Sequence, residues 1–431
     1  MATELGDLHL AELHERAADA GVSGYRKLPR EKLIEALGRK DSGIVDDEAD
    51  TDELVVVDAT LLDDARDEPV EVDAGGAEEG EEHGDDLPTE QVRGVLELTR
   101  QRYGFLRLSG LESEEADVYI SAAQVRRCEL RSGDEVSGPA RGPRRGERHR
   151  ALVHVDQVNG HEPETGERID FDALAPVIPE RRMHLGDGAE VLVRAVDLLA
   201  PLAFGQRILI RAASRSGRTT LLRQIARAAA GNESARLIVL LVDESPEEAT
   251  AWREALPGAE FAIATAEMAA VEQVRVAELA LERARRVTES GGDAVLVCDS
   301  LSRLAFATGD GTEAKRLFGS GRNLAGGGSL TVVATVLADA LDEGAAERAV
   351  ATTESSLIVL DPELAASGVT PAIRPAECRV SNEDQIRNGD ELEAARKLRT
   401  LLSELKPSDA AALLRERIEA TASNAELLGS F

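Results

Sequence analysis

After Gly186 the chain alternates short apolar runs with longer segments of helical periodicity. Apolar runs of strand length occupy residues 207–210, 237–242, 294–298, 330–335 and 356–360. Between these runs, apolar positions recur at the spacing of an amphipathic helix in residues 219–230, 247–254 and 272–288. This alternation predicts a parallel sheet with helices on its faces. From Gly389 onward the leucine pattern is helical, and Pro407 interrupts it.

Between residues 92 and 178 the apolar positions follow a shorter period. The runs are brief, as at 118–120 and 151–155, and turns rich in glycine, proline and serine separate them. This pattern predicts a small antiparallel β-barrel. Residues 1–40 carry two helix-like patterns, which predict a small helical domain at the start of the chain.

The net charge of −31 is concentrated in one segment. Between Asp41 and Glu90 there are 21 acidic residues and a single basic residue, Arg66. Because this segment has few large apolar residues, it cannot bury enough surface to offset the entropy of its chain, and we expect a disordered acidic linker. The predicted domains are therefore residues 1–40, 41–90, 91–180 and 181–431.

Composition narrows the class of protein. The chain is 42% hydrophobic, which is ordinary for a folded protein. No apolar run approaches the roughly 18 to 20 residues of a membrane helix, and the N-terminus lacks a secretory pattern. We therefore expect a cytoplasmic protein with no membrane partner. The single cysteines Cys128, Cys298 and Cys378 fit neither a disulfide framework nor a CxxC metal site.

The candidate chemistry begins directly after the first strand of the predicted sheet. There residues 212–219 read AASRSGRT and lead into a helix, which is the context of a phosphate-binding loop. Such a loop uses backbone amides and a lysine on phosphate, and a threonine hydroxyl on Mg²⁺. Thr219 is present, but Arg218 stands in the place of the lysine. Because the planar fork of arginine is bulkier than an ammonium, nucleotide binding can survive while turnover suffers.

Carboxylates follow two other strands of the predicted sheet. Asp243 and Glu244 end the apolar run 237–242, and Asp299 ends the run 294–298. The carboxyl ends of parallel strands face the ligand crevice. In that position Asp299 is suited to hold Mg²⁺ through water, and Glu244 is suited to act as general base on an attacking water. The alternative of strand-end carboxylates that face solvent stays open.

The predicted barrel carries side chains suited to single-stranded nucleic acid. Tyr103, Phe105 and Tyr119 lie in strand-like segments, where each flat ring can stack on an unpaired base. Arginines give this segment a local positive balance that attracts phosphate: Arg102, Arg107, Arg126, Arg127, Arg131, Arg141, Arg144, Arg145, Arg148 and Arg150. The alternative, in which the rings form the barrel core and the arginines a solvated surface, stays open.

Ordered blocks along nearly the whole chain resemble the bacterial transcription termination factor Rho family. Three blocks resemble the RNA-contacting segments of the Rho barrel: 103–107, 117–119 and 146–149. Five more resemble the Rho motor domain: 205–207, 215–220, 241–248, 299–305 and 316–323. The resemblance implies a multidomain α/β protein with a small N-terminal helical domain, an OB-like β-barrel RNA-binding domain and a RecA-like P-loop ATPase domain.

The resemblance also implies the residues of each site. RNA would be bound by Arg102, Tyr103, Gly104, Phe105, Leu106, Arg107, Asp117, Val118, Tyr119, Glu147, Arg148 and His149. ATP would be bound by Gly205, Gln206, Arg207, Arg215, Ser216, Gly217, Arg218, Thr219, Thr220 and Ser245. The catalytic residues would be Glu244 and Arg218, and the Mg²⁺ ligands would be Thr219 and Asp299.

Several positions depart from the family pattern in the ATP site. Besides Arg218, the arginine finger of the family falls at Ser381 in an alignment without gaps, and Arg379 is close enough to substitute only if the register shifts. Ser245 stands where an arginine normally follows the Asp-Glu pair. An arginine finger is worth about 10³ to 10⁵ in rate, so its loss together with the altered loop predicts impaired hydrolysis.

The RNA-contacting segments also depart from the family. His149 stands where the family usually has tyrosine, residues 306–314 are far shorter than the RNA-gripping central loop, and Ala351 lies near the missing lysine of a second loop. The resemblance implies a homohexameric translocase or helicase that captures single-stranded RNA and acts on transcription complexes, with RNA polymerase as a partner. The alternative is a pseudo-ATPase that binds RNA or regulates an active Rho paralogue.

Overall fold

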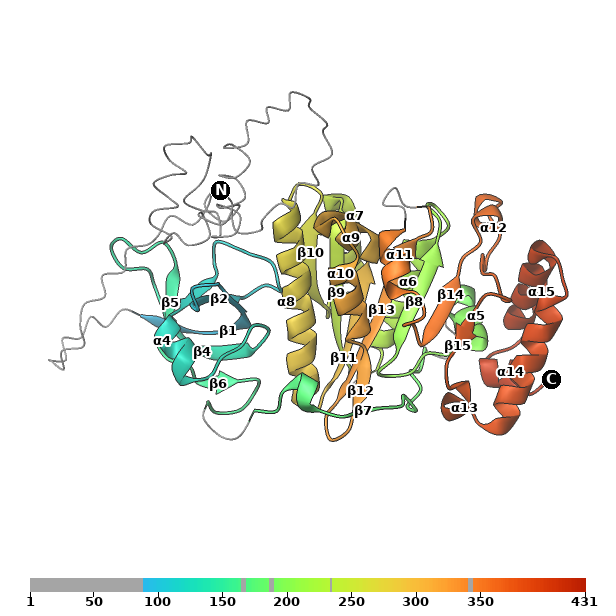
Figure 1. Ribbon diagram of the computed structural model, residues 1–431, viewed down its shortest axis with the longest axis horizontal. Helices are drawn as coiled ribbons and strands as arrows, with labels where there is room; N and C mark the ends of the chain where they lie inside the picture. Colours follow the sequence, from blue (N-terminus) through green and yellow to red (C-terminus); the bar gives the residue numbers. More distant parts are fainter. Residues whose placement is uncertain (1–87, 164–167, 186–189, 233–234, 340–343) are drawn as a thin grey trace, which may run out of the picture. The chain divides into compact units, whose positions relative to one another are not determined.

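The computed structural model describes residues 88–163, 168–185, 190–232, 235–339 and 344–431, which carry two β-sheets (Figure 1). Both sheets belong to one unit, residues 84–431. The predicted helical domain 1–40 and nearly all of the acidic segment 41–90 lie outside the described residues.

The first sheet is a closed barrel. Its strands follow the order β1 (Thr89–Leu98), β2 (Gly104–Arg107), β3 (Val118–Ile120), β5 (Arg150–Leu152) and β4 (Glu135–Arg141), and β4 pairs back onto β1. β6 (Gln157–Val158) pairs with β4, and the short helix α4 (Ala122–Arg127) follows β3. Alternate residues along the strands fill the interior, where Leu96, Leu106, Val118 and Ile120 are fully buried. The predicted OB-like barrel is therefore confirmed, but it is not wholly antiparallel as expected, because β3 and β5 pair in parallel.

The second sheet is mostly parallel. Its main path runs β10 (Glu260–Thr265), β9 (Ala235–Glu244), β11 (Asp293–Asp299), β13 (Ser329–Leu337), β8 (Arg207–Ala212), β14 (Ser356–Val359) and β15 (Arg379–Val380). All neighbours on this path are parallel except β14 and β15. The short strands β7 (Pro176–Val177) and β12 (Arg322–Leu324) extend it through β13. The five strands expected from apolar runs all form, and β10 is an additional strand.

Helices cover both faces of this sheet, because its strands present apolar residues on both sides. Along β8, Ile208 and Ile210 pack on one face and Leu209 on the other. The first face holds α5 (Val191–Leu199), α6 (Arg218–Ala230) and α7 (Pro246–Ala255), and α14 (Gly389–Ser403), α15 (Pro407–Glu419) and α16 (Asn424–Leu428) pack against α5 and share its apolar core. The second holds α8 (Ala270–Glu289), α9 (Leu301–Thr308), α10 (Thr312–Gly319) and α11 (Ala345–Val350). Short helices η3 (Phe171–Ala173), α12 (Pro362–Ala366) and α13 (Glu383–Ile386) lie in the connections.

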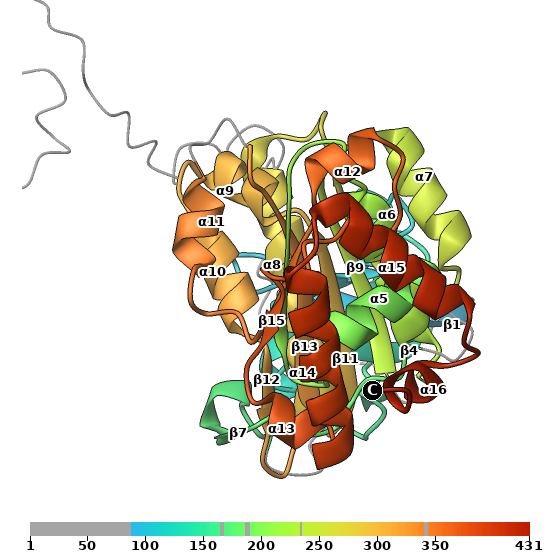
Figure 2. The same ribbon diagram turned by 90° about the vertical axis from the view of Figure 1, so that its right-hand side faces the viewer.

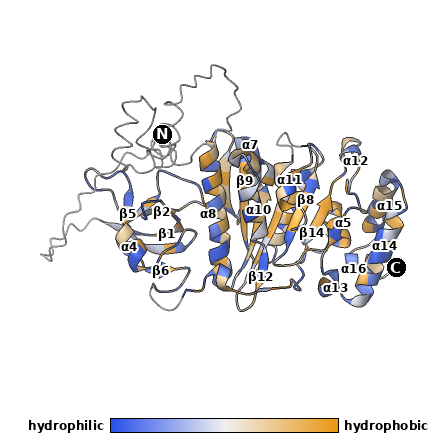
Figure 3. Ribbon diagram, viewed as in Figure 1, coloured by the Kyte–Doolittle hydropathy of each residue, from blue (hydrophilic) through white to orange (hydrophobic). Residues whose placement is uncertain are grey.

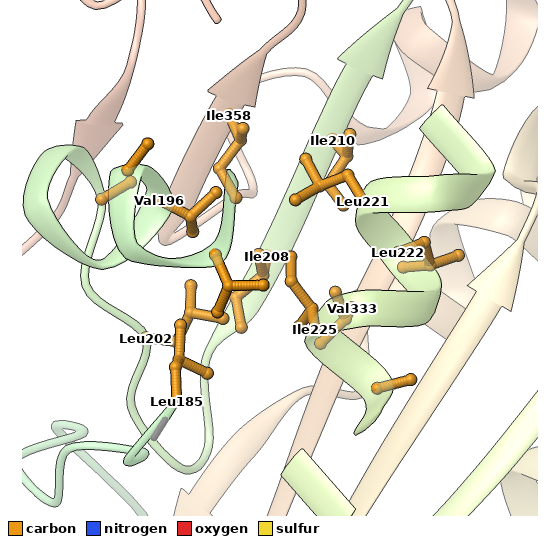
Figure 4. Close-up of a cluster of buried hydrophobic side chains, with 14 of the residues drawn as sticks. Leu185, Val196, Leu202, Ile208, Ile210, Leu221, Leu222, Ile225, Val333 and Ile358 are labelled. Atoms are coloured by element: carbon orange, nitrogen blue, oxygen red, sulfur yellow. The ribbon is translucent and has the colours of Figure 1, made fainter. Parts of the chain in front are cut away.

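The packing of the first face fixes α6 on the sheet. Leu221, Leu222 and Ile225 of α6 lie against Ile210 and Val333 of the central strands (Figure 4). Apolar residues run through the strands of this sheet (Figure 3), and α14 and α15 pack beside α5 (Figure 2). The loop before α6 is therefore held at the carboxyl end of β8 by the packing of the helix that follows it.

Candidate functional site

The loop that joins β8 to α6 has the geometry of an anion-binding helix N-terminus. Gly217 directly precedes the first helical residue, and its φ of 85° is a left-handed conformation that favours glycine. No side chain caps this end of α6. The first N–H groups of the helix therefore lack a side-chain acceptor, which is the arrangement that binds phosphate at helix N-termini.

Arg218, Thr219 and Asp299 form one contact group at this loop. Nη2 of Arg218 lies 3.0 Å from Oδ1 of Asp299. The Thr219 hydroxyl donates to Oδ2 at 3.0 Å, and the Thr335 hydroxyl of β13 donates to Oδ1 at 3.0 Å. Asp299 is fully buried. The structure thus brings the predicted phosphate-binding arginine together with both predicted metal ligands.

Glu244 lies at the end of β9 and forms an ion pair with Arg303 of α9. The residue is only 7% exposed. Burial raises the pKa of the Glu244 carboxyl, while the positive charge of Arg303 acts in the opposite direction. A carboxylate with a raised pKa is better suited to accept a proton from water near neutral pH. Because Glu244 and Asp299 are both buried, the alternative of solvent-facing carboxylates does not hold for either of them.

A further carboxylate contacts the loop. Asp339, which follows β13, accepts from the Ser214 N–H at 2.9 Å on Oδ1 and 3.0 Å on Oδ2. The Ser214 hydroxyl lies 3.2 Å from Oδ1. Sequence reasoning missed Asp339, Arg303 and Thr335. Asp339 had a usable signal, because it comes two residues after an apolar strand, at the same sheet edge as Asp299.

Of the other predicted nucleotide-binding residues, some lie on the loop or the first turn of α6, and Ser245 lies at the start of α7. Arg215 and Thr220 are exposed on the loop and the first turn of α6, whereas Ser216 is buried. Ser245 instead caps α7, where its hydroxyl accepts from the Glu248 N–H at 3.2 Å. This contact gives Ser245 a structural reason to be serine, independent of any nucleotide.

Gly205, Gln206 and Arg207 lie at the start of β8, at the opposite end of the strand from the loop. Arg207 donates to the Gly321 carbonyl at 2.8 Å, and Gln206 is 1% exposed. Within one chain these three residues do not join the Asp299 group. Their part in ATP binding stays a prediction.

The loop fits a nucleotide phosphate better than it fits a metal ion. The buried Nε of Arg218 has no hydrogen-bond partner among the described residues, so one donor of this guanidinium is left unsatisfied at the loop. Both oxygens of Asp299 are already engaged by donors of the chain. Nowhere in the described residues do three or more His, Cys, Asp or Glu side chains gather as a metal site.

The two positions considered for the arginine finger lie at the sheet edge beyond β14. Arg379 belongs to β15, has a side chain 63% exposed and forms an ion pair with Glu354. The Ser381 N–H donates to the Ser355 carbonyl at 2.8 Å. Of the two candidate positions, Arg379 therefore carries a basic side chain, and that side chain is exposed to solvent.

Four aromatic rings gather on the outer surface of the barrel. Phe105 of β2 lies opposite Tyr119 of β3, with ring centroids 6.0 Å apart. Tyr103 lies 5.6 Å from Tyr119 and 5.9 Å from Phe105, and His149 lies 5.1 Å from Phe105. All four are half-buried, and the barrel interior is filled by aliphatic residues instead. The alternative that these rings form the barrel core is therefore wrong.

Arg107 lies beneath this aromatic surface and is 4% exposed. Its Nε donates to Glu97 at 2.8 Å, and its guanidinium also pairs with the buried Asp117. The guanidinium carbon lies 5.8 Å from the centre of the Phe105 ring. Gly104, Leu106 and Val118 are buried beside it. These residues support the surface, and direct contacts from them to RNA stay a prediction.

Exposed arginines flank the rings. Arg102, Arg144, Arg145 and Arg148 are exposed. Arg148 has no side-chain partner among the described residues, so its charge is available to a phosphate. By contrast, hydrogen bonding from Arg141 lowers the pKa of Glu147 to about 2, so Glu147 is committed to that arginine at neutral pH.

Two family models match the chain in the regions of these two sites. Residues 92–164 match the Rho termination factor RNA-binding domain, and residues 193–319 match the nucleotide-binding domain of the ATP synthase alpha/beta family. The first match confirms the predicted RNA-binding barrel, and the second confirms the predicted nucleotide-binding domain.

Solved structures and described helices add two points. An ATPase of the type III secretion system of pathogenic bacteria is similar in structure, with a TM-score of 0.51 over 65% of this chain and 93% of that chain, at 21% identity. At that identity the similarity shows the fold alone. No helix among the described residues is long and apolar enough to cross a membrane.

Curated relatives share much of this sequence. The transcription termination factor Rho of Streptomyces lividans is 39% identical over 78% of this chain, and that of Bacillus subtilis is 42% identical over 58%. The chain spans only 51% and 63% of the length of these two proteins. It spans 85% of the Rho of Chromobacterium violaceum, which is 37% identical over 77% of this chain. The chain therefore belongs to the transcription termination factor Rho family.

Proposed function

We propose that this chain is an RNA-binding, ATP-dependent ring protein that acts in transcription termination, with weakened hydrolysis. The observation that carries the proposal is the pairing, in one family member, of an aromatic RNA-binding surface with a phosphate loop. We propose that it works in the cytoplasm as a homohexamer, with single-stranded RNA and RNA polymerase as partners.

In the proposed ATP site the loop amides and Arg218 bind the phosphates, while Thr219 and Asp299, the predicted Mg²⁺ ligands, are engaged with each other, and Asp299 also with Arg218. Glu244 would orient and deprotonate the attacking water, because it is a buried carboxylate with a raised pKa beside that group. For Asp299 to reach a metal ion, Arg218 or a hydroxyl donor would have to give up its contact.

Weakened hydrolysis follows from the same contacts. Arg218 forms an ion pair with Asp299. A guanidinium bound to a carboxylate is less able to stabilise the negative charge that develops on the phosphoryl group during transfer. At the position of the arginine finger Ser381 carries no charge, and Arg379 is occupied by Glu354. Loss of a finger alone costs about 10³ to 10⁵ in rate.

A second candidate function is a pseudo-ATPase that binds RNA or regulates an active Rho paralogue. The observation that favours it is the coincidence of several departures: Arg218, Ser245, Ser381 and the short connection between α9 and α10. The RNA-binding surface, by contrast, keeps three aromatic rings in mutual contact.

The test is ATP hydrolysis by the purified chain, with and without pyrimidine-rich single-stranded RNA. RNA-stimulated turnover that disappears in Glu244→Gln supports a working motor. Turnover absent in a folded preparation that binds both RNA and nucleotide supports the pseudo-ATPase. A preparation that binds RNA but no nucleotide overturns the ATP-dependent proposal in both forms.

A further inference from the structure

We infer that Arg218 takes the place of a divalent cation at Asp299, so that this site binds nucleotide without Mg²⁺. The inference rests on the proposed nucleotide site and adds to it the ionic requirement of binding. It identifies the ligand as the phosphates of a metal-free nucleoside di- or triphosphate.

The first support is the occupancy of the Asp299 carboxylate. Oδ1 receives both Arg218 Nη2 and the Thr335 hydroxyl at 3.0 Å, and Oδ2 receives the Thr219 hydroxyl at 3.0 Å. A carboxylate oxygen has two acceptor positions, so Oδ1 is filled by donors of the chain itself. Because Asp299 is fully buried, its oxygens cannot turn toward solvent to find a metal ion.

The second support is the charge at this position. Mg²⁺ at a phosphate loop bridges a protein oxygen and phosphate oxygens with positive charge. A guanidinium is always protonated and presents several N–H donors in one plane. Arg218 already binds the protein oxygen through Nη2, while its buried Nε has no partner among the described residues. Its remaining donors can therefore bind phosphate while the ion pair stays intact.

The third support is the location of Arg218 itself. It is the first residue of α6, directly after Gly217, where the helix N-terminus has no side-chain cap. A phosphate bound there would meet the backbone N–H groups and the guanidinium together. A lysine ammonium carries its three donors on one nitrogen, so it cannot hold the carboxylate and the phosphate on separate nitrogens as the guanidinium fork can.

The experiment measures the Kd of a fluorescent ATP analogue for the full chain, in Mg²⁺ and in excess EDTA, for the wild type and for Arg218→Lys. We expect EDTA to change the wild-type Kd by less than about threefold and to weaken the Lys variant by about tenfold or more. Arg227→Lys, an exposed arginine on the same helix, is the matched control and should respond to EDTA as the wild type does.

A second measurement follows Mn²⁺ by electron paramagnetic resonance in the presence of ADP. With the wild type, the Mn²⁺ spectrum should be the same as that of Mn²⁺ and ADP without protein. With Arg218→Lys, the spectrum should show Mn²⁺ bound to the protein together with ADP. A tenfold loss of wild-type affinity in EDTA, or Mn²⁺ bound by the wild type, overturns the inference but leaves the nucleotide site standing. If the wild type binds no nucleotide in either Mg²⁺ or EDTA, the inference and the proposed nucleotide site are overturned together. If the Lys variant fails to fold, the wild-type results alone decide.

Discussion

Replacing Phe105 by alanine removes the ring at the centre of the proposed RNA-binding surface. Phe105 is within 6.0 Å of the rings of Tyr103, Tyr119 and His149, measured between ring centroids. Stacking of a base on an aromatic side chain contributes about 1 to 3 kcal/mol, which is about 5- to 150-fold in Kd. Since Phe105 also contacts the other rings, we expect the upper part of this range.

The assay is fluorescence anisotropy with a short labelled cytidine oligonucleotide over a series of salt concentrations. Phe105→Ala should weaken binding without changing the dependence of log Kd on log salt, because a phenyl ring contacts no phosphate. Arg148→Ala should weaken binding and reduce that slope by about 0.7, the contribution of one phosphate contact on a single strand. Val177→Ala, the truncation of an exposed apolar side chain on β7 of the second sheet, should change neither quantity.

A Kd for Phe105→Ala within about twofold of the wild type would refute the stacking argument. A change in salt slope equal to that of Arg148→Ala would refute the separation of stacking from phosphate binding. Because Phe105 is half-buried outside the barrel core, a general loss of barrel structure is not the expected cause of weaker binding.

Three further predictions concern single contacts. Arg107→Met should destabilise the barrel by about 3 to 5 kcal/mol, because it leaves the buried Asp117 without its cation and leaves Glu97 with Arg275 alone, and hydrogen exchange of the β1 and β2 amides measures this. Asp339→Asn should tighten nucleotide binding by about fivefold in a fluorescence titration, because it removes a negative charge from the loop. His149→Tyr should tighten RNA binding by about two- to fivefold in the anisotropy assay, since a larger ring stacks better.

The fold could be predicted to a large extent from apolar patterning. Parallel strands buried on both faces are continuous apolar runs, and β9, β11 and β13 are such runs. β10 was not predicted because its apolar stretch is short and half of it is alanine. Its burial depends on α8 and β9 beside it rather than on its own sequence. The barrel was predictable for a similar reason, since its turns separate brief alternating strands.

The candidate site was predictable in its location but not in its contacts. Parallel topology alone brings the loop after β8 and the carboxylates after β9 and β11 to one edge. Which donor engages Asp299 depends on side chains from three elements, including Thr335 of β13, and no local pattern carries that information. Arg107 shows the same limit, because a basic residue between aromatic ones suggests phosphate binding until its burial beside Glu97 is known.

The two proposed sites should respond differently to substitution, and this difference would explain how one can change while the other is kept. In the proposed RNA site, rings and cations would act largely one by one, so each loss would cost its own increment of affinity. Hydrolysis uses groups that act as a unit, so the loss of any one removes most of the rate and later losses cost little more. Once Arg218 had replaced the loop lysine, departures such as Ser245 and Ser381 would therefore carry little additional penalty, whereas each ring around Phe105 would still contribute to RNA binding.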